Sequence, residues 1–210
     1  MSHAWDYTSL GTDWPDDIAA CEGSNQSPIN IVKDEAISAS PTRSLRKACA
    51  SVTGKFVNED GNILKFELPD GKALVSPSES LTGGPFDNVK YYFHHFVLHW
   101  GNADCEGSEH TVDFNRCAYY NDLEKYVLLS VLFRYPAELQ IVHVKEDHVD
   151  NSDGTVDFSS AYADSTGLAI LSIFIQGGAD NTTVDTTWMN VSQLSHPTNY
   201  SIQEVQLALF

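Results

Sequence analysis

The sequence predicts one domain that is mainly β, with only minor helix. Short apolar or alternating segments recur between clusters of turn residues, whereas helical periodicity is weak along the whole chain. The length of 210 residues fits a single domain, and a hydrophobic fraction of 42% is enough to build a substantial core. The chain has no internal repeat, heptad pattern or linker, so residues 1–210 are expected to fold as one unit.

The expected elements follow one another in chain order. Residues 1–30 carry aromatic side chains among Gly, Pro, Asp and Ser, which predicts a loop-rich arm. Residues 51–58 and 62–68 alternate in hydrophobicity on either side of an Asn-Glu-Asp-Gly turn, which predicts a hairpin. The best helical periodicity lies at residues 122–133 and 203–209. Further strands are expected at residues 72–75, 90–100, 139–144 and 168–175.

The chain is strongly acidic, with 29 Asp and Glu residues against 12 Lys and Arg residues and a net charge of −17. This charge repels the phosphates of nucleic acids and of anionic membranes, so neither is an expected partner. The longest apolar stretch, residues 126–133, is far shorter than the roughly 20 residues of a membrane span. A cation or a basic surface is the partner that such a surface favours, although solubility alone also explains the charge.

Cysteines and glycosylation motifs favour a secreted or extracellular protein over a cytoplasmic one. No signal peptide begins the sequence, so it is read as either a cytosolic chain or a mature secreted one. Four cysteines without CxxC spacing are candidates for disulfides, and three pairings stay open. Four Asn-x-Ser/Thr motifs are candidates for N-glycosylation. The cysteines are Cys21, Cys49, Cys105 and Cys117, and the asparagines are Asn25, Asn181, Asn190 and Asn199.

The acidic turn at residues 147–157 invites comparison with a calcium loop. Aligning Gly154 with the invariant glycine of an EF-hand puts Val149 at the first ligand position and Ser160 at the last. Neither residue has the required carboxylate, so the sequence predicts a solvated acidic loop instead.

Three central segments carry residue types typical of a metal-dependent active site. They are Phe96-Val-Leu-His-Trp-Gly101, Gly107-Ser-Glu-His-Thr-Val-Asp113 and Ala137-Glu-Leu-Gln-Ile-Val-His143. Together with Gln26-Ser-Pro-Ile-Asn-Ile31, Gly83-Gly-Pro85 and Gly167-Leu-Ala-Ile-Leu-Ser-Ile-Phe174, they make the chain resemble the α-class carbonic anhydrases. The resemblance implies an α+β fold around a large, mostly antiparallel twisted sheet with few short helices. It also implies zinc-dependent hydration of CO2.

The resemblance places the three zinc ligands of the family, all histidines there, at Val97, His99 and Gln140. Valine offers no lone pair, and the amide oxygen of glutamine is a poor substitute for imidazole on zinc. Apparent zinc affinities are on the order of 10 kcal/mol, and each ligand supplies a large share, so we expect no bound metal and no other cofactor. The expected protein is a catalytically silent homologue. The alternative is a zinc-dependent carbonate dehydratase with atypical ligands.

A neighbouring histidine does not rescue this ligand set. His95 shares the alternation of Val97 and His99, but lies four residues from His99, about 13 Å along an extended strand. His94 is expected to point to the opposite face of the sheet.

The resemblance also assigns residues around the ligand positions. Glu138 matches the carboxylate that orients the third histidine, and Glu109 and His110 match the hydrogen-bonded pair beside it. Tyr7 belongs to the same remnant set, and Asn62 occupies the proton-shuttle position, where an amide carries no proton near neutral pH. Without zinc, we expect the remaining polar groups to form a buried network that holds strands in register.

Two departures from the family concern larger segments. The connection at about residues 119–136 is an insert, expected either to pack on the body or to dock a partner. The C-terminal segment of the family, with further strands and the partner of Cys21, is not in this sequence. One alternative is therefore an oligomer, or a second chain, that completes the sheet. The resemblance to catalytically silent members of the family implies a role in binding, recognition or matrix structure. The partner expected for this chain is a protein, a glycan, or a cation or mineral surface.

Overall fold

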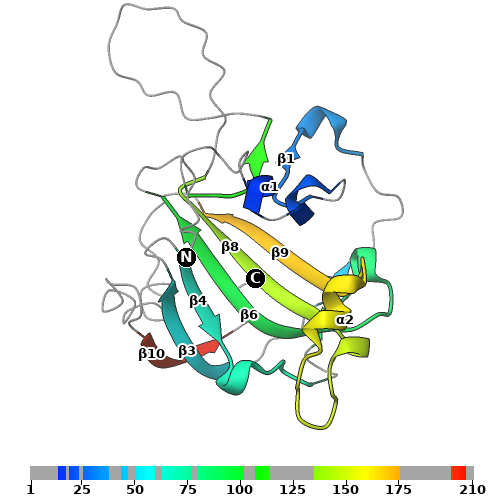
Figure 1. Ribbon diagram of the computed structural model, residues 1–210, viewed down its shortest axis with the longest axis vertical. Coiled ribbons are helices and arrows are strands. Elements are labelled where there is room, and N and C mark those ends of the chain that lie inside the picture. Colours follow the sequence, from blue (N-terminus) through cyan, green and yellow to red (C-terminus); the bar gives the residue numbers. More distant parts are fainter. Residues whose placement is uncertain are drawn as a thin grey trace, which may run out of the picture.

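An antiparallel six-stranded sheet forms the body of the computed structural model (Figure 1), with strand order β10-β3-β4-β6-β8-β9. The strands are β3 (Ser51–Glu59), β4 (Ile63–Glu67), β6 (Tyr91–Trp100), β8 (Ala137–Lys145), β9 (Leu168–Ile175) and β10 (Tyr200–Gln206). The structure describes residues 14–17, 19–23, 26–37, 44–46, 51–59, 63–76, 80–101, 107–113, 135–175 and 200–206. The prediction of a mainly β fold with few short helices is confirmed.

The remaining elements are short. They are α1 (Trp14–Asp17), η1 (Ala19–Glu22), β1 (Asn30–Ile31), η2 (Lys33–Glu35), β2 (Leu45–Arg46), η3 (Pro69–Gly71), β5 (Thr82–Gly83), η5 (Gly84–Phe86), β7 (Thr111–Val112), η6 (Glu146–His148) and α2 (Phe158–Ala163). β1 pairs with β7 in parallel, and β2 pairs with β5 in antiparallel fashion. The β1–β7 pair joins residues 30–31 to residues 111–112, which directly follow Glu109 and His110 in the chain.

Most of the expected strands are present, and two expectations are wrong. The hairpin is β3 and β4, and the strands expected at 90–100, 139–144 and 168–175 are β6, β8 and β9. Residues 72–75 form no strand, although Leu74 donates its backbone N–H to Phe93 and Ala73 donates to Gly154. Residues 203–206 are part of β10 and not of a helix, because pairing with β3 overrides a weak helical pattern. The expected helix at 122–133 lies outside the described residues.

An aromatic cluster forms the core on one face of the sheet. Phe66 stacks on Phe96 with ring centroids 5.0 Å apart, and Phe56 meets both rings at 5.0 and 5.8 Å. Leu139 and Ile141 of β8 extend the same buried cluster. These residues come from four neighbouring strands at alternating positions, so their burial sets the register of the sheet.

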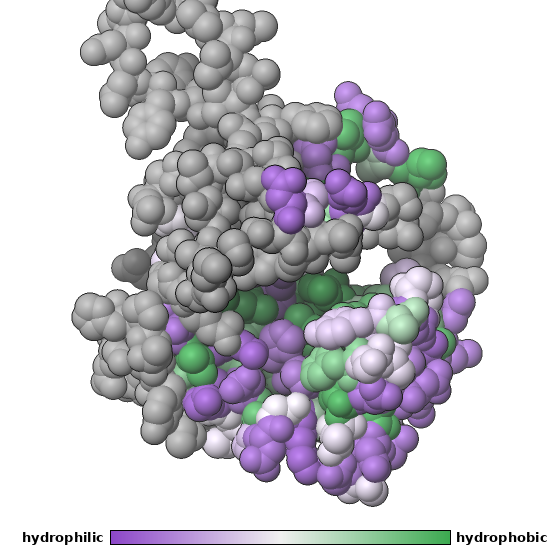
Figure 2. Space-filling model, viewed as in Figure 1, coloured by the Kyte–Doolittle hydropathy of each residue, from purple (hydrophilic) through white to green (hydrophobic). Residues whose placement is uncertain are grey.

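Hydrophilic residues predominate along the lower rim of the face seen in Figure 2, and hydrophobic residues appear between them and in the hollow above. The acidic turn between η6 and α2 is exposed, as the sequence predicts for a solvated loop. Within the described part of the chain, no helix combines the length and apolar character that a bilayer crossing requires.

Candidate functional site

The face of β6 and β8 opposite the aromatic core collects the polar residues. Val97 pairs with Gln140 across the two strands, and His99 pairs with Glu138. Directly opposite residues of an antiparallel pair lie on the same face, and alternate residues of one strand do so too. The three predicted ligand positions therefore lie together on one face of the sheet.

Glu138 is the centre of a hydrogen-bonded network on this face. Its side chain is fully buried. Its Oε2 accepts the backbone N–H groups of Glu109 and His110, each at 2.9 Å, and its Oε1 lies 2.6 Å from Nδ1 of His110. The segment after residue 107 thus supplies donors that a buried carboxylate requires.

The ionisation of this pair follows from its contacts. Burial alone would raise the pKa of Glu138, but hydrogen bonds from His110 and Gln140 lower this pKa to about 2. The contact with Glu138 raises the pKa of His110. Glu138 is therefore a carboxylate near neutral pH, and its charge favours protonated His110.

Gln140 and His99 join the same network through Glu109. Nε2 of Gln140 donates to Oε2 of Glu109 at 3.2 Å and to Oε1 of Glu138 at 3.1 Å. Nδ1 of His99 lies 3.5 Å from Oε1 of Glu109. The amide donors of Gln140 thus face two carboxylates, and its neutral oxygen is the only ligand atom that it has left to offer.

This donor set does not fit the zinc of a three-histidine site. His99 supplies one imidazole, Gln140 one amide oxygen and Val97 no ligand atom. Among the described residues, no group of three or more His, Cys, Asp or Glu side chains is arranged to hold a metal ion.

The strict alternation expected at the start of β6 is wrong. The register shifts between Phe93 and His95, and this bulge brings Nδ1 of His94 within 2.6 Å of Nδ1 of His95. Nε2 of His94 donates to the carbonyl oxygen of Gly71 at 2.8 Å. Burial, and then the neighbouring His94, lower the pKa of His95 to about 4. His95 stays on the face of Val97, but its partner is Val142, and this pair lies four positions along the strands from the pair of His99 and Glu138.

Sequence reasoning missed Lys65, the partner of Val97 on β4. Its Nζ lies 3.0 Å from Oε2 of Glu67, whose Oε1 is 3.4 Å from Nζ of Lys55. The alternation of the predicted hairpin was the signal that could have placed Lys65 on the face of the ligand positions.

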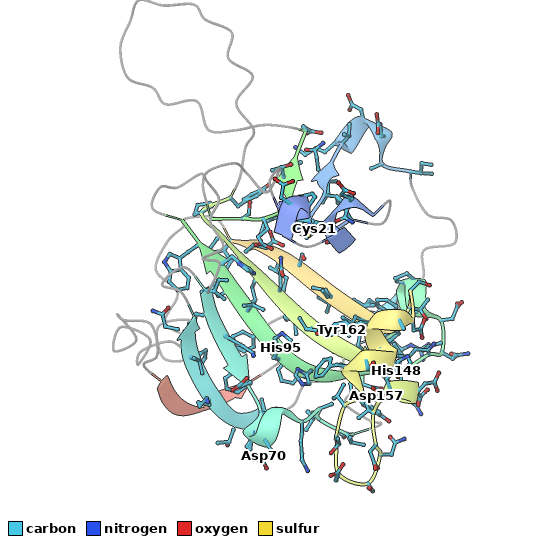
Figure 3. All side chains as sticks on the ribbon, in the orientation of Figure 1. Cys21, Asp70, His95, His148, Asp157 and Tyr162 are labelled. Carbon is cyan, nitrogen blue, oxygen red and sulfur yellow. The ribbon has the colours of Figure 1, made fainter. Side chains whose placement is uncertain are left out.

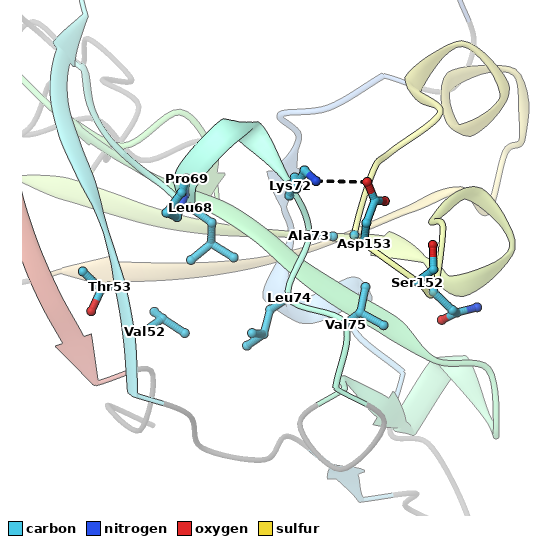
Figure 4. A pocket seen from close by; sticks show the side chains of 12 residues that line it. Val52, Thr53, Leu68, Pro69, Lys72, Ala73, Leu74, Val75, Ser152 and Asp153 are labelled. Atoms are coloured by element: carbon cyan, nitrogen blue, oxygen red, sulfur yellow. Dashed lines mark hydrogen bonds and ion pairs between the residues drawn. The ribbon is translucent and has the colours of Figure 1, made fainter.

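A pocket of about 510 Å³ lies between β3, the segment that follows β4 and the acidic turn (Figure 4). Val52, Leu68 and Leu74 form apolar parts of its lining, and Lys72 and Asp153 form an ion pair of 3.0 Å at its edge. None of the predicted ligand positions lines this pocket, so it is separate from the polar face of β6 and β8.

Several predicted residues lie outside the described part of the chain. Cys21 is described, and it is a free, half-buried thiol. Of the insert, the structure describes only Tyr135 and Pro136. Outside the described residues are Tyr7, Asn62, the other three cysteines (Cys49, Cys105 and Cys117) and the four sequon asparagines (Asn25, Asn181, Asn190 and Asn199).

Comparison with known proteins gives matches to one family. The family model for eukaryotic-type carbonic anhydrase matches residues 10–123. Human "Carbonic anhydrase 5A, mitochondrial" is 27% identical over 171 residues, which are 81% of this chain and 47% of that protein. "Carbonic anhydrase 1" of Monodelphis domestica is 32% identical over 170 residues, which are 80% of this chain and 53% of that protein. The chain spans about half the length of these curated relatives.

Proposed function

Because the chain belongs to the α-class, eukaryotic-type carbonic anhydrase family, we propose that it is a member without the catalytic zinc and without CO2 hydration. Its role is then binding, recognition or support of a matrix. The observation that carries this proposal is the donor set at the paired positions of β6 and β8, where Val97 faces Gln140 beside a single imidazole of His99.

The chemistry of zinc supports the proposal. A catalytic zinc of this kind is held by three neutral imidazoles, and one imidazole with one amide oxygen supplies far less binding free energy. The Gln140 amide is already tied to Glu109 and Glu138. Lys65, opposite Val97, offers no lone pair to a metal, because its ammonium group is paired with Glu67.

The alternative is a carbonate dehydratase that holds zinc through atypical ligands. It is favoured by the intact contacts of Glu138 with His110 and by His99, which keeps an imidazole at one ligand position. The two proposals differ in metal content and in turnover, so one set of measurements separates them.

The test measures zinc by mass spectrometry and CO2 hydration by stopped flow in the unaltered chain and in a Val97→His/Gln140→His double variant. We expect far less than one zinc per unaltered chain and no inhibitor-sensitive hydration. The double variant should gain zinc, because both residues already lie on the face of His99. His143→Gln is a matched control that leaves the three positions unchanged and should gain no metal. Stoichiometric zinc with acetazolamide-sensitive turnover in the unaltered chain would overturn the proposal.

We further propose a secreted or extracellular glycoprotein whose acidic surface, with a net charge of −17, meets a cationic partner. The four sequons and the even cysteine count support this location. One curated relative is mitochondrial by name, so the competing location is intracellular. Expression in animal cells, followed by glycosidase treatment of the medium, tests it: a mass shift of secreted chain is expected, and retention of unglycosylated chain in the cell contradicts the proposal.

A further inference from the structure

A serine, a histidine and an aspartate form a hydrogen-bonded series next to α2, away from the polar face of β6 and β8. Nδ1 of His148 lies 2.6 Å from Oγ of Ser160, and Nε2 of His148 lies 3.0 Å from Oδ2 of Asp164. His148 ends η6, Ser160 belongs to α2 and Asp164 follows α2. Figure 3 shows His148 beside α2, close to the labelled Asp157 and Tyr162.

Asp164 is held in place by four contacts. Its Oδ1 accepts the backbone N–H and the hydroxyl of Thr166, both at 2.8 Å, and its Oδ2 lies 3.0 Å from Nζ of Lys145 and from Nε2 of His148. These hydrogen bonds, that of His148 first, hold the pKa of Asp164 well below its usual range. Asp164 is therefore an acceptor only, and Nε2 of His148 carries the proton that lies between them.

This tautomer decides the direction of the second hydrogen bond. When the imidazole of His148 carries a single proton, that proton is on Nε2, and Nδ1 then holds a lone pair that accepts from the hydroxyl of Ser160. The other acceptor near this hydroxyl, the carbonyl oxygen of Asp157, is 3.5 Å away. The 2.6 Å contact is much the shorter of the two, so the serine proton points to the imidazole.

The start of α2 does not require the Ser160 hydroxyl. The Asp157 side chain already caps the helix, because its Oδ1 accepts the backbone N–H of Ser160 at 3.1 Å. The hydroxyl is thus left to the imidazole. Ser160 is half-buried and the side chain of His148 is 13% exposed, so solvent reaches the serine while its base is largely shielded.

We propose that Ser160 is a nucleophile, with His148 as its general base and Asp164 as a positioning residue, that cleaves small activated carboxylic esters without a metal. Serine, histidine and carboxylate are hydrogen-bonded in series in hydrolases on unrelated folds, which are recognised by geometry and not by sequence position. In that template the serine contacts Nε2 and the carboxylate Nδ1, whereas His148 uses Nδ1 for Ser160 and Nε2 for Asp164. The class of substrate follows from the partial exposure of Ser160, which favours small reactive acyl groups.

The proposed step balances in atoms and electrons. Oγ of Ser160 forms a bond to the acyl carbon while its proton passes to Nδ1 of His148. The bond from the acyl carbon to the leaving alkoxide or phenoxide breaks, and that oxygen takes the proton from His148. Water then attacks the acyl-serine, gives a proton to His148 and releases the carboxylic acid, and the proton returns to Ser160.

The experiment uses a fluorophosphonate probe and 4-nitrophenyl acetate on the full chain in the presence of a zinc chelator. The probe forms a bond from phosphorus to Oγ of Ser160 and releases fluoride, so mass spectrometry of peptides maps the labelled residue. Ser160→Ala and His148→Gln should each slow labelling and ester cleavage at least tenfold, since general-base catalysis contributes about 10²–10⁴-fold. Ser159→Ala, on the exposed neighbouring position of α2, is the matched control and should react like the unaltered chain.

Each outcome decides the proposal. A label on Ser160 with slow Ser160→Ala and His148→Gln variants supports it. Absence of labelling in the unaltered chain, a label elsewhere, or equal rates for Ser159→Ala and Ser160→Ala would overturn it. Mapping the label in the unaltered chain requires no variant to fold, and the chelator separates this activity from any zinc-dependent hydratase.

Discussion

The two faces of β6 and β8 are stabilised in different ways. One face packs Phe96, Leu139 and Ile141 into an aromatic and aliphatic core that comes mostly from neighbouring strands. The other face buries Glu138, whose partners are Gln140 on the same strand and, far along the chain, residues 109 and 110. Apolar packing is non-directional and tolerates small shifts, whereas a buried carboxylate requires each donor in place. The core face therefore follows from alternation alone, and the polar face depends on how a separate segment docks.

The largest effect is expected on the apolar face. Phe66→Ala removes a fully buried ring between Phe56 and Phe96 and should lower the free energy of unfolding by about 3–5 kcal/mol. Urea denaturation of the unaltered chain and the variant measures it. Tyr162→Ala, at a position 70% exposed, is the control and should change stability little. Equal losses in the two variants would contradict a core centred on Phe66.

The contribution of Glu138 on the polar face to the free energy of unfolding should depend on pH in the acid range. The pKa of Glu138 is about 2 in the folded protein and 4.5 ordinarily, so its contribution is complete above pH 4.5 and disappears as pH falls to about 2. This shift corresponds to stability on the order of 3 kcal/mol. Unfolding free energies measured between pH 2 and 5 should rise steeply in the unaltered chain and less so in Glu138→Gln. Parallel curves would show that Glu138 is not the titrating group.

A smaller effect tests how the segment after residue 107 approaches β8. A Cβ added at Gly107 would overlap the carbonyl oxygen of Pro136, directly before β8. Gly107→Ala should therefore destabilise the fold by about 1–3 kcal/mol through overpacking. Thermal unfolding measures the loss of stability. Gly71→Ala is the contrasting variant, because a Cβ added at Gly71 meets no atom and only the positive φ of this residue disfavours alanine. If Gly107→Ala unfolds at the same temperature as the unaltered chain, the segment after residue 107 can shift away from Pro136 without a loss of stability.

The smallest effect is expected for an ion pair at the surface. Lys72 and Asp153 are 3.0 Å apart, with side chains 37% and 47% exposed. Solvent screens such a pair, so Lys72→Ala should lower stability by less than about 1 kcal/mol. Denaturation at low and high salt checks this, and a loss as large as that of Phe66→Ala would show that exposed pairs matter here as much as the core.

Part of the site could be predicted because strand alternation is local. Alternation places Val97 with His99, and Glu138 with Gln140, on single faces, and the structure pairs them across β6 and β8. The bulge at His94 was unpredictable, because one extra residue breaks the alternation and its position depends on pairing with β8. The strand at β10 was missed for a related reason, since its pairing with β3 connects residues distant in sequence.

By itself, the sequence determined the β-rich fold, the acidic character and the donor atoms available at positions 97, 99 and 140, since these depend on residue type and local spacing. Only the tertiary structure decided which atoms meet. The docking of Glu109 and His110 on Glu138 joins groups from separate elements, and so does the alignment of His148 with Ser160 and Asp164. Hydrogen bonds require distances near 3 Å and defined directions, and packing of the whole chain sets these, not local sequence.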